Sequence, residues 1–152
     1  MQIINTTNLN EARKEIQKLK KENKPIIVKA QSQEFNRKIL EIKDVEIFLS
    51  PEIHDRKDSL KQRDSGLNEV LCNLATKNNI KIAINLNEII KLEKKQKAIV
   101  LSRIIQNIKL CKKSKTPLST YSKNNLKKQE IQSFLLTLKA STQQAKDAIR
   151  FN

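Results

Sequence analysis

Short apolar runs alternate along the chain with stripes of hydrophobic residues at helical spacing. Runs at 25–30, 44–51, 80–86 and 116–122 are bounded by polar or turn-forming residues and predict buried strands. A fifth strand is predicted at 2–5. Because apolar strands alternate with helices, the pattern predicts an α/β fold with a mainly parallel sheet, open or curled toward a barrel.

The helices are marked by stripes and by capping residues. The clearest stripe places apolar side chains at positions i, i+3, i+4, i+7 and i+8, and consists of Leu67, Val70, Leu71, Leu74 and Ala75. Asn8 with Glu11, and Ser141 with Gln144, are helix-start signals, and Asn87 is a further candidate cap. Helices are therefore expected over 9–22, 31–42, 67–79, through 101–111, around 131–138, and from 141 to 149.

The composition of the chain gives it a strong positive charge. The 152 residues suit one domain, 1–152, and 31 basic against 16 acidic residues give a net charge of +15 with a pI near 9.9. Such a charge on a small domain indicates a polyanionic partner. Aromatic residues are only 3%, so stacking on bases is not expected and contacts should fall on phosphates. The sequence shows neither a signal-peptide pattern nor an apolar membrane span, and we expect a cytoplasmic protein without membrane contact.

Few residues suit catalysis or metal binding. His54 is the only histidine, and Cys72 and Cys111 lack the spacing of metal ligands. We interpret both cysteines as small core residues in a reducing compartment. Gly66 is the only glycine, which excludes the glycine-rich loops that bind nucleotide phosphates. No catalytic residue, bound metal or protein-held cofactor is therefore expected.

The stretch HDRKDSLKQRDSGLNEVL, residues 54–71, concentrates the chain's unusual residues before a helix. Backbone N–H groups at a helix start, with basic residues around them, can bind phosphate. The alternative is a solvated loop held by internal arginine–aspartate pairs. For His54 the corresponding alternatives are a hydrogen bond to backbone and a contact to phosphate.

These residues resemble the central signature of archaeal ribonuclease P protein component 3, a subunit related to the PHP-type TIM barrels. The family pattern of His-x-Arg-Lys-Asp and then Asp-Ser-Gly-Leu-Asn corresponds here to His54, Arg56, Lys57, Asp58 and residues 64–68, followed by Asn85-Leu86 after the next strand. A later helix resembles the family's Arg-x-x-x-Asn-x-x-Leu-Cys-x-Lys pattern at Arg103, Asn107, Leu110, Cys111 and Lys113, and QQAKDAI (143–149) resembles its closing helix.

The resemblance is specific from Ser50 to Arg150, and before Ser50 only the order of elements matches. The run Thr120-Tyr121-Ser122-Lys123 departs from the family's small-residue loop. The chain is also short for the family. The resemblance therefore implies a truncated TIM-barrel-like fold of PHP type.

The resemblance further implies a non-catalytic, RNA-binding subunit of ribonuclease P, which removes the 5′ leader of precursor tRNA. Its partners would be the ribonuclease P RNA and protein component 2, in a heterotetramer, with magnesium held by the RNA and precursor tRNA reached through the holoenzyme. An apolar partner surface is also expected, with the helix over 9–22 as one candidate.

We predict phosphate contacts from basic residues of the loop and of the later helix and strand, namely Arg56, Lys57, Lys61, Arg63, Arg103, Lys109, Lys112, Lys113 and Lys123. Two other functions stay open. One is a free-standing metal-dependent phosphoesterase of the same barrel superfamily, and the other is a general basic protein associated with ribosomes or DNA.

Overall fold

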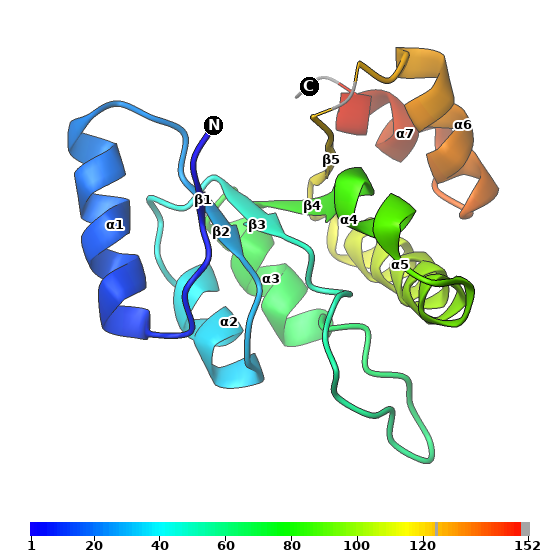
Figure 1. Ribbon diagram of the computed structural model, residues 1–152, viewed down its shortest axis with the longest axis horizontal. Coiled ribbons are helices and arrows are strands. Elements are labelled where there is room, and N and C mark those ends of the chain that lie inside the picture. The colour runs from blue at the N-terminus through cyan, green and yellow to red at the C-terminus, as the bar shows by residue number, and fades with distance from the viewer. Residues whose placement is uncertain (124, 150–152) are drawn as a thin grey trace.

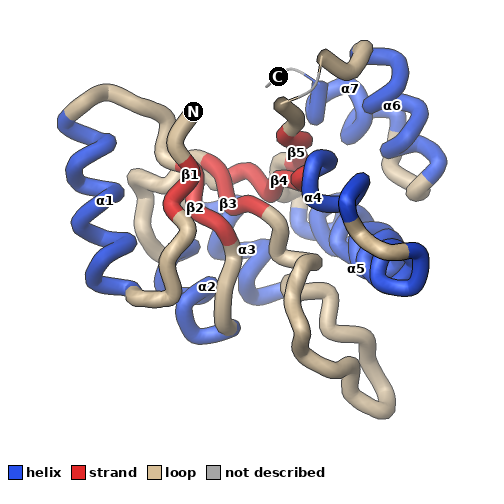
Figure 2. Tube along the Cα trace, viewed as in Figure 1, coloured by secondary structure: helices blue, strands red, loops and turns tan. Residues whose placement is uncertain are grey.

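Five parallel strands form one sheet in the order β1-β2-β3-β4-β5. The computed structural model describes residues 1–123 and 125–149, so Arg150, the end of the expected family match, lies outside the described residues. The strands are β1 (Ile3–Ile4), β2 (Ile27–Lys29), β3 (Ile47–Leu49), β4 (Lys81–Asn85) and β5 (Leu118–Tyr121). All four pairings are parallel, and Figure 2 shows the strands as one curved row. The predicted open parallel sheet, including the strand at 2–5, is confirmed.

The helices alternate with the strands as the sequence predicts. They are α1 (Leu9–Lys21), α2 (Gln33–Leu40), α3 (Glu69–Lys77), α4 (Leu86–Lys91), α5 (Lys94–Ser114), α6 (Lys128–Thr137) and α7 (Thr142–Ile149). Asn8 caps α1, and the Ser141–Gln144 capping box before α7 forms in both directions. The prediction of Asn87 as a cap is wrong, because Asn85 accepts the N–H of Asn87 and caps α4 at the end of β4.

Most of the core lies between the outer face of the sheet and the helices. One residue from each strand, in register across the sheet, points into this core: Ile4, Val28, Phe48, Ile82 and Leu118. Cys72 on α3 and Cys111 on α5 lie fully buried within it, which confirms their predicted place in the core. Figure 1 shows α1, α2, α3 and α5 around this outer side of the curved sheet.

The inner face of the sheet corresponds to the lumen of a barrel. A smaller apolar cluster lies here, formed by Ile27, Leu49 and Ala83, with Ile3, Ile47 and Tyr121 packed beside it. Lys29 also points to this side and pairs with Glu88 of α4 at 2.9 Å, so α4 is tied to the carboxyl end of β2. A curved, open, parallel sheet with helices outside is the truncated TIM-barrel-like arrangement expected from the sequence.

The carboxyl ends of the strands carry the longest loop. Residues 50–68 connect β3 to α3, and part of this loop projects away from the body of the molecule (Figure 1). In parallel α/β folds, functional groups gather at this edge because loops from neighbouring strands meet there. The candidate site is therefore built from this loop and from α5, which packs beside it.

Candidate nucleic-acid interface

The two ends of the β3–α3 loop lie in close contact with each other. Gly66 has a φ of +82°, and a Cβ atom placed there would lie 1.7 Å from the carbonyl oxygen of Pro51. Only a residue without a side chain fits this crossing, since both the backbone conformation and the space exclude one. The chain's single glycine therefore closes the base of the loop instead of exposing backbone to a phosphate.

Asp64 is the centre of the loop's hydrogen-bond network. Its carboxylate accepts from the Nε of Arg56 at 2.8 Å and from the N–H of Gly66 at 2.9 Å. Its own N–H donates to Asp58 at 2.8 Å. The pKa of Asp64 lies below its usual value, because these hydrogen bonds and the nearby positive charge outweigh its partial burial.

His54 is part of the same network, and only 8% of its side chain is exposed. Nδ1 accepts the N–H of Arg56 at 3.2 Å, so the other ring nitrogen carries the proton and donates to the carbonyl of Asp64 at 3.0 Å. Burial and the charges of Arg103 and Arg56 lower the pKa of His54, so the ring is neutral at pH 7. His54 is thus the backbone-bonded loop residue given above as one of two alternatives.

The guanidinium of Arg56 makes its hydrogen bonds within the protein. Besides its bond to Asp64, its Nη1 donates to the carbonyl of Gln31, which joins the β3–α3 loop to the loop after β2. Its Nη2 is buried without a hydrogen-bond partner among the described residues. The internal arginine–aspartate pair considered from the sequence is present, and Arg56 mainly shapes the loop.

Three side chains on one face of α5 hold the loop against the helix. The guanidinium of Arg103 donates to the carbonyls of Glu52, His54 and Arg56 at 3.1, 2.9 and 3.1 Å. Gln106 and Asn107 donate to two further loop carbonyls, of Arg63 and Ser65, at 3.1 and 3.0 Å. Carbonyl groups on a loop lack the backbone N–H partners that a helix or sheet provides. The row of three side chains on α5 supplies hydrogen-bond donors in their place.

Arg103 therefore has a different role from the predicted phosphate contact. Only 6% of the residue is exposed, and its donors are directed at loop carbonyls. Gln106 was not predicted as a site residue, although its position three residues after Arg103 places it on the same helical face.

The other basic residues of the loop and of α5 face solvent. Lys57, Lys61 and Arg63 are exposed on the loop, and Arg63 lies 3.8 Å from Asp58. On α5, Lys109 and Lys113 follow Gln106 at intervals of one turn and continue its row, and Lys113 pairs with Glu69 at 3.0 Å. Gln106 binds the loop at the carbonyl of Arg63, which brings the loop beside α5. We call the five exposed cations of these two elements the loop–α5 surface.

Two predicted cations lie apart from this surface. Lys112 lines a hollow with Lys81, Lys115 and residues at the start of α7, on the side where β5 begins. Lys123 lies beyond the end of β5, where its N–H donates to Asn87 at 3.3 Å. The nine predicted residues therefore comprise five grouped cations, two separate exposed cations and two arginines that shape the loop.

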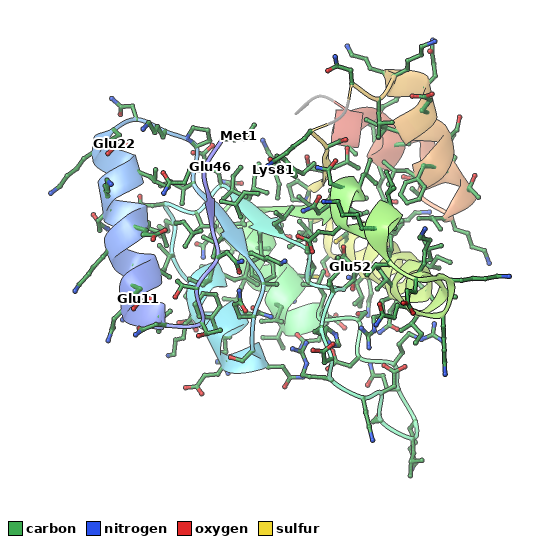
Figure 3. All side chains as sticks on the ribbon, viewed as in Figure 1. Met1, Glu11, Glu22, Glu46, Glu52 and Lys81 are labelled. Carbon is green, nitrogen blue, oxygen red and sulfur yellow. The ribbon has the colours of Figure 1, made fainter. Side chains whose placement is uncertain are left out.

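The first turn of the loop carries a buried carboxyl group. Glu52 is 1% exposed, and burial raises its pKa to about 8, so it is mostly protonated at pH 7. Figure 3 shows it in the interior, whereas Glu11 and Glu22 lie at the periphery on α1. Glu88, the neighbouring carboxylate, is already paired with Lys29. Among residues 1–123 and 125–149, no three histidine, cysteine or carboxylate side chains converge as metal ligands.

No protein-family model matches this chain. Proteins named Ribonuclease P protein component 3 from Methanococcus maripaludis and Methanococcus vannielii are each 32% identical over 114 residues, which is 75% of this chain and 46% of theirs. The protein of that name from Methanocaldococcus jannaschii is 27% identical over 140 residues. This chain thus spans about half the length of the curated relatives.

A solved structure agrees with these matches. A chain in the cryo-EM structure of archaeal Ribonuclease P with mature tRNA superposes with a TM-score of 0.80 and 24% identity, covering 97% of this chain and 62% of that one. None of the helices in the described part is long and apolar enough to cross a membrane. The resemblance stated from the residues is confirmed: over three quarters of its length, this chain is homologous to archaeal ribonuclease P protein component 3.

Proposed function

We propose that the chain is a non-catalytic subunit of ribonuclease P that binds the RNA of this enzyme through phosphate contacts. The observation that carries the proposal is the loop–α5 surface. It places three exposed cations on a loop that Arg103, Gln106 and Asn107 hold on both sides of its projecting tip, and two more on the helix that bears these three residues. A fixed loop loses little conformational freedom on binding, so its charges contribute more to affinity.

The chemistry of the site favours this function over a metal-dependent phosphoesterase. Enzymes of this architecture place their catalytic groups at the carboxyl end of the sheet. Here that end holds Glu52, which is mostly protonated, Glu88, which is paired with Lys29, and a neutral His54 whose ring is hydrogen-bonded to the backbone. These groups are already engaged or uncharged, so they are poor ligands for a divalent cation. Any magnesium needed for cleavage would be held by the RNA.

The family relationship supports further partners, and these belong to the same proposal. We expect the chain to act in the cytoplasm with protein component 2, as a heterotetramer, and to reach precursor tRNA only within the holoenzyme. Exposed apolar residues offer a protein contact near the α4–α5 turn, where Ile90 and Ile99 are 57% and 41% exposed.

Reconstitution tests the proposal. Cleavage of precursor tRNA is measured with the ribonuclease P RNA and component 2 from the chain's own genome, with and without this chain, at limiting magnesium. The proposal predicts faster cleavage when the chain is added and no cleavage by the chain alone. Equal rates with and without it, or cleavage by the protein without RNA, would contradict the proposal.

A further inference from the structure

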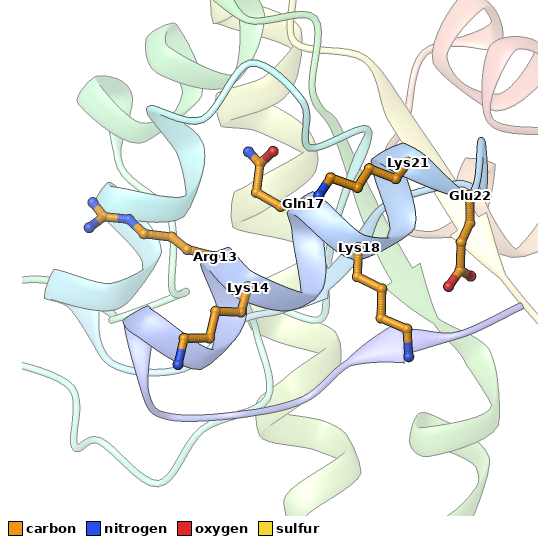
Figure 4. A pocket seen from close by; sticks show the side chains of 6 residues that line it. All are labelled: Arg13, Lys14, Gln17, Lys18, Lys21 and Glu22. Carbon is orange, nitrogen blue, oxygen red and sulfur yellow. The ribbon is translucent and has the colours of Figure 1, made fainter.

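The outer face of α1 carries a second set of basic residues. The buried side of this helix is formed by Ala12, Ile16 and Leu19, so the opposite side faces solvent. Four exposed cations lie there, Arg13, Lys14, Lys18 and Lys21. Figure 4 shows Arg13, Gln17 and Lys21 on one side of the helix and Lys14, Lys18 and Glu22 on the other, and these six residues line a shallow groove of about 520 Å³.

The four cations of α1 make no direct ion pair. In the described part of the chain, no carboxylate lies within 4.0 Å of Arg13, Lys14, Lys18 or Lys21. Glu22, at the end of the groove, pairs with Lys24 at 2.6 Å, and its pKa is lowered mainly by Lys24 and to a smaller extent by the charge of Lys18. The next helix differs, because Arg37 and Lys38 on α2 both lie within 4.0 Å of Glu41.

The chemistry of this face fits RNA better than protein or membrane. The helix over 9–22 was one candidate for an apolar partner surface, but the buried side of α1 holds its apolar side chains and none of the exposed large hydrophobic residues lies on it. A membrane-surface helix needs exposed apolar residues to enter the lipid. Four cations over about 12 Å of helix, without an apolar centre, instead match a run of phosphates.

We propose that the outer face of α1 is a second RNA-binding surface, separate from the loop–α5 surface. The inference rests on the proposed function, since it assigns the same RNA a second contact. Figure 1 places α1 at one end of the molecule and the projecting loop with α5 toward the other. Two separated surfaces on one rigid body bind with increased overall affinity when one RNA molecule reaches both.

A matched pair of variants tests this surface. In the α1 variant, Arg13→Gln, Lys14→Gln, Lys18→Gln and Lys21→Gln are combined. In the control, Lys94→Gln, Lys95→Gln, Lys128→Gln and Lys146→Gln remove the same charge from exposed positions on α5, α6 and α7. Glutamine keeps the helical propensity of lysine, and thermal unfolding checks that both variants fold like the wild type.

Filter binding to the cognate ribonuclease P RNA is measured from roughly 0.05 to 0.2 M salt. Removing one cation that binds a phosphate lowers the slope of log affinity against log salt by about one, so the α1 variant should show a slope smaller by about two to three units, and an affinity at least about tenfold weaker. The control variant should keep a slope within about one unit of the wild type. Equal slopes and affinities for the two variants would overturn the inference.

A second readout needs no variant. Acetylation of lysines in the wild-type protein is followed by mass spectrometry with and without the RNA, and Lys14, Lys18 and Lys21 should be protected while Lys94 and Lys95 stay reactive. Unchanged reactivity of the α1 lysines would also refute the site. If the wild type does not prefer this RNA to an unrelated RNA of equal length, the proposed function fails, whereas the comparison of variants still shows whether α1 binds RNA.

Discussion

The loop after β3 and the outer face of α1 each carry four basic residues, but the two regions use them differently. In the loop, Arg56 is bound to Asp64 and to the carbonyl of Gln31, and Arg63 lies near Asp58. On α1, the four cations make no ion pair within the described residues. The loop needs part of its charge to hold an irregular backbone together, whereas a helix satisfies its own backbone and leaves its cations available.

This difference shows that a count of basic residues does not locate a phosphate-binding surface. Burial and internal partners decide which cations are available, and Arg103 is the clearest case. It belongs to the basic residues of the family-like pattern, but it is enclosed by three loop carbonyls. The two kinds of cation should therefore respond differently to mutation, one through stability and the other through RNA affinity.

The largest effect is expected from Arg103→Ala. Three loop carbonyls would be left without their charged donor, so the free energy of unfolding should fall by about 3 kcal/mol or more. Urea unfolding measures this decrease. Lys109→Ala, on the solvent side of the same helix, is the matched control and should change stability by less than about 0.5 kcal/mol. If the Arg103 variant were as stable as the control, the buried arginine would not hold the loop.

The second-largest change in stability is expected at Glu52, and it depends on pH. Its pKa is about 8 in the folded protein, against a usual value of 4.5, so the folded state keeps a proton that the unfolded state releases. Stability should therefore be full below about pH 4.5 and fall as the pH rises toward 8, by up to about 1.4 kcal/mol per unit. Glu52→Gln should flatten this dependence and raise stability at pH 7 by about 3 kcal/mol.

Unfolding of both proteins in urea at pH 5, 7 and 8.5 measures the Glu52 effect. Glu88→Gln is the matched control, because Glu88 is paired with Lys29, whereas Glu52 is buried with one carboxyl oxygen lacking a hydrogen-bond partner among the described residues. An unchanged pH dependence in the Glu52 variant would show that this carboxyl ionises normally in the folded protein.

The smallest effect on stability, and the one that concerns binding, is expected from Lys57→Gln, Lys61→Gln and Arg63→Gln combined. These side chains are exposed, so unfolding should be almost unchanged, while affinity for the ribonuclease P RNA should fall about tenfold, or 1.4 kcal/mol. Arg56 is left unchanged because its removal would disturb the loop itself. A variant that binds normally would remove the loop from the RNA-binding surface.

Much of the fold follows from the hydrophobic pattern. The strands and the helices were predictable because buried strands form short apolar runs and each helix shows a stripe. The break between α4 and α5 at Leu92 and Glu93 was not, since apolar residues continue on both sides of it. Asn85 was missed as a cap because it ends a strand and starts a helix at the same residue.

The site was less predictable than the fold. The loop, its aspartates and its basic residues stand out in the sequence, and so do Arg103 and Asn107. Their hydrogen bonds join residues more than forty positions apart, so no local spacing shows which cations are enclosed. The basic residues of α1 can be read from the sequence. Whether they are available to a phosphate depends on which carboxylates lie close to them, and only the packing of the helices shows this.

Exposed cations on a folded scaffold are proposed to bind the phosphates of the ribonuclease P RNA. The most direct measurement is the salt dependence of wild-type binding to this RNA. We expect a slope of log affinity against log salt steeper than about −5, together with tighter binding than to an unrelated RNA of equal length. A slope shallower than about −2, or equal affinity for both RNAs, would contradict it.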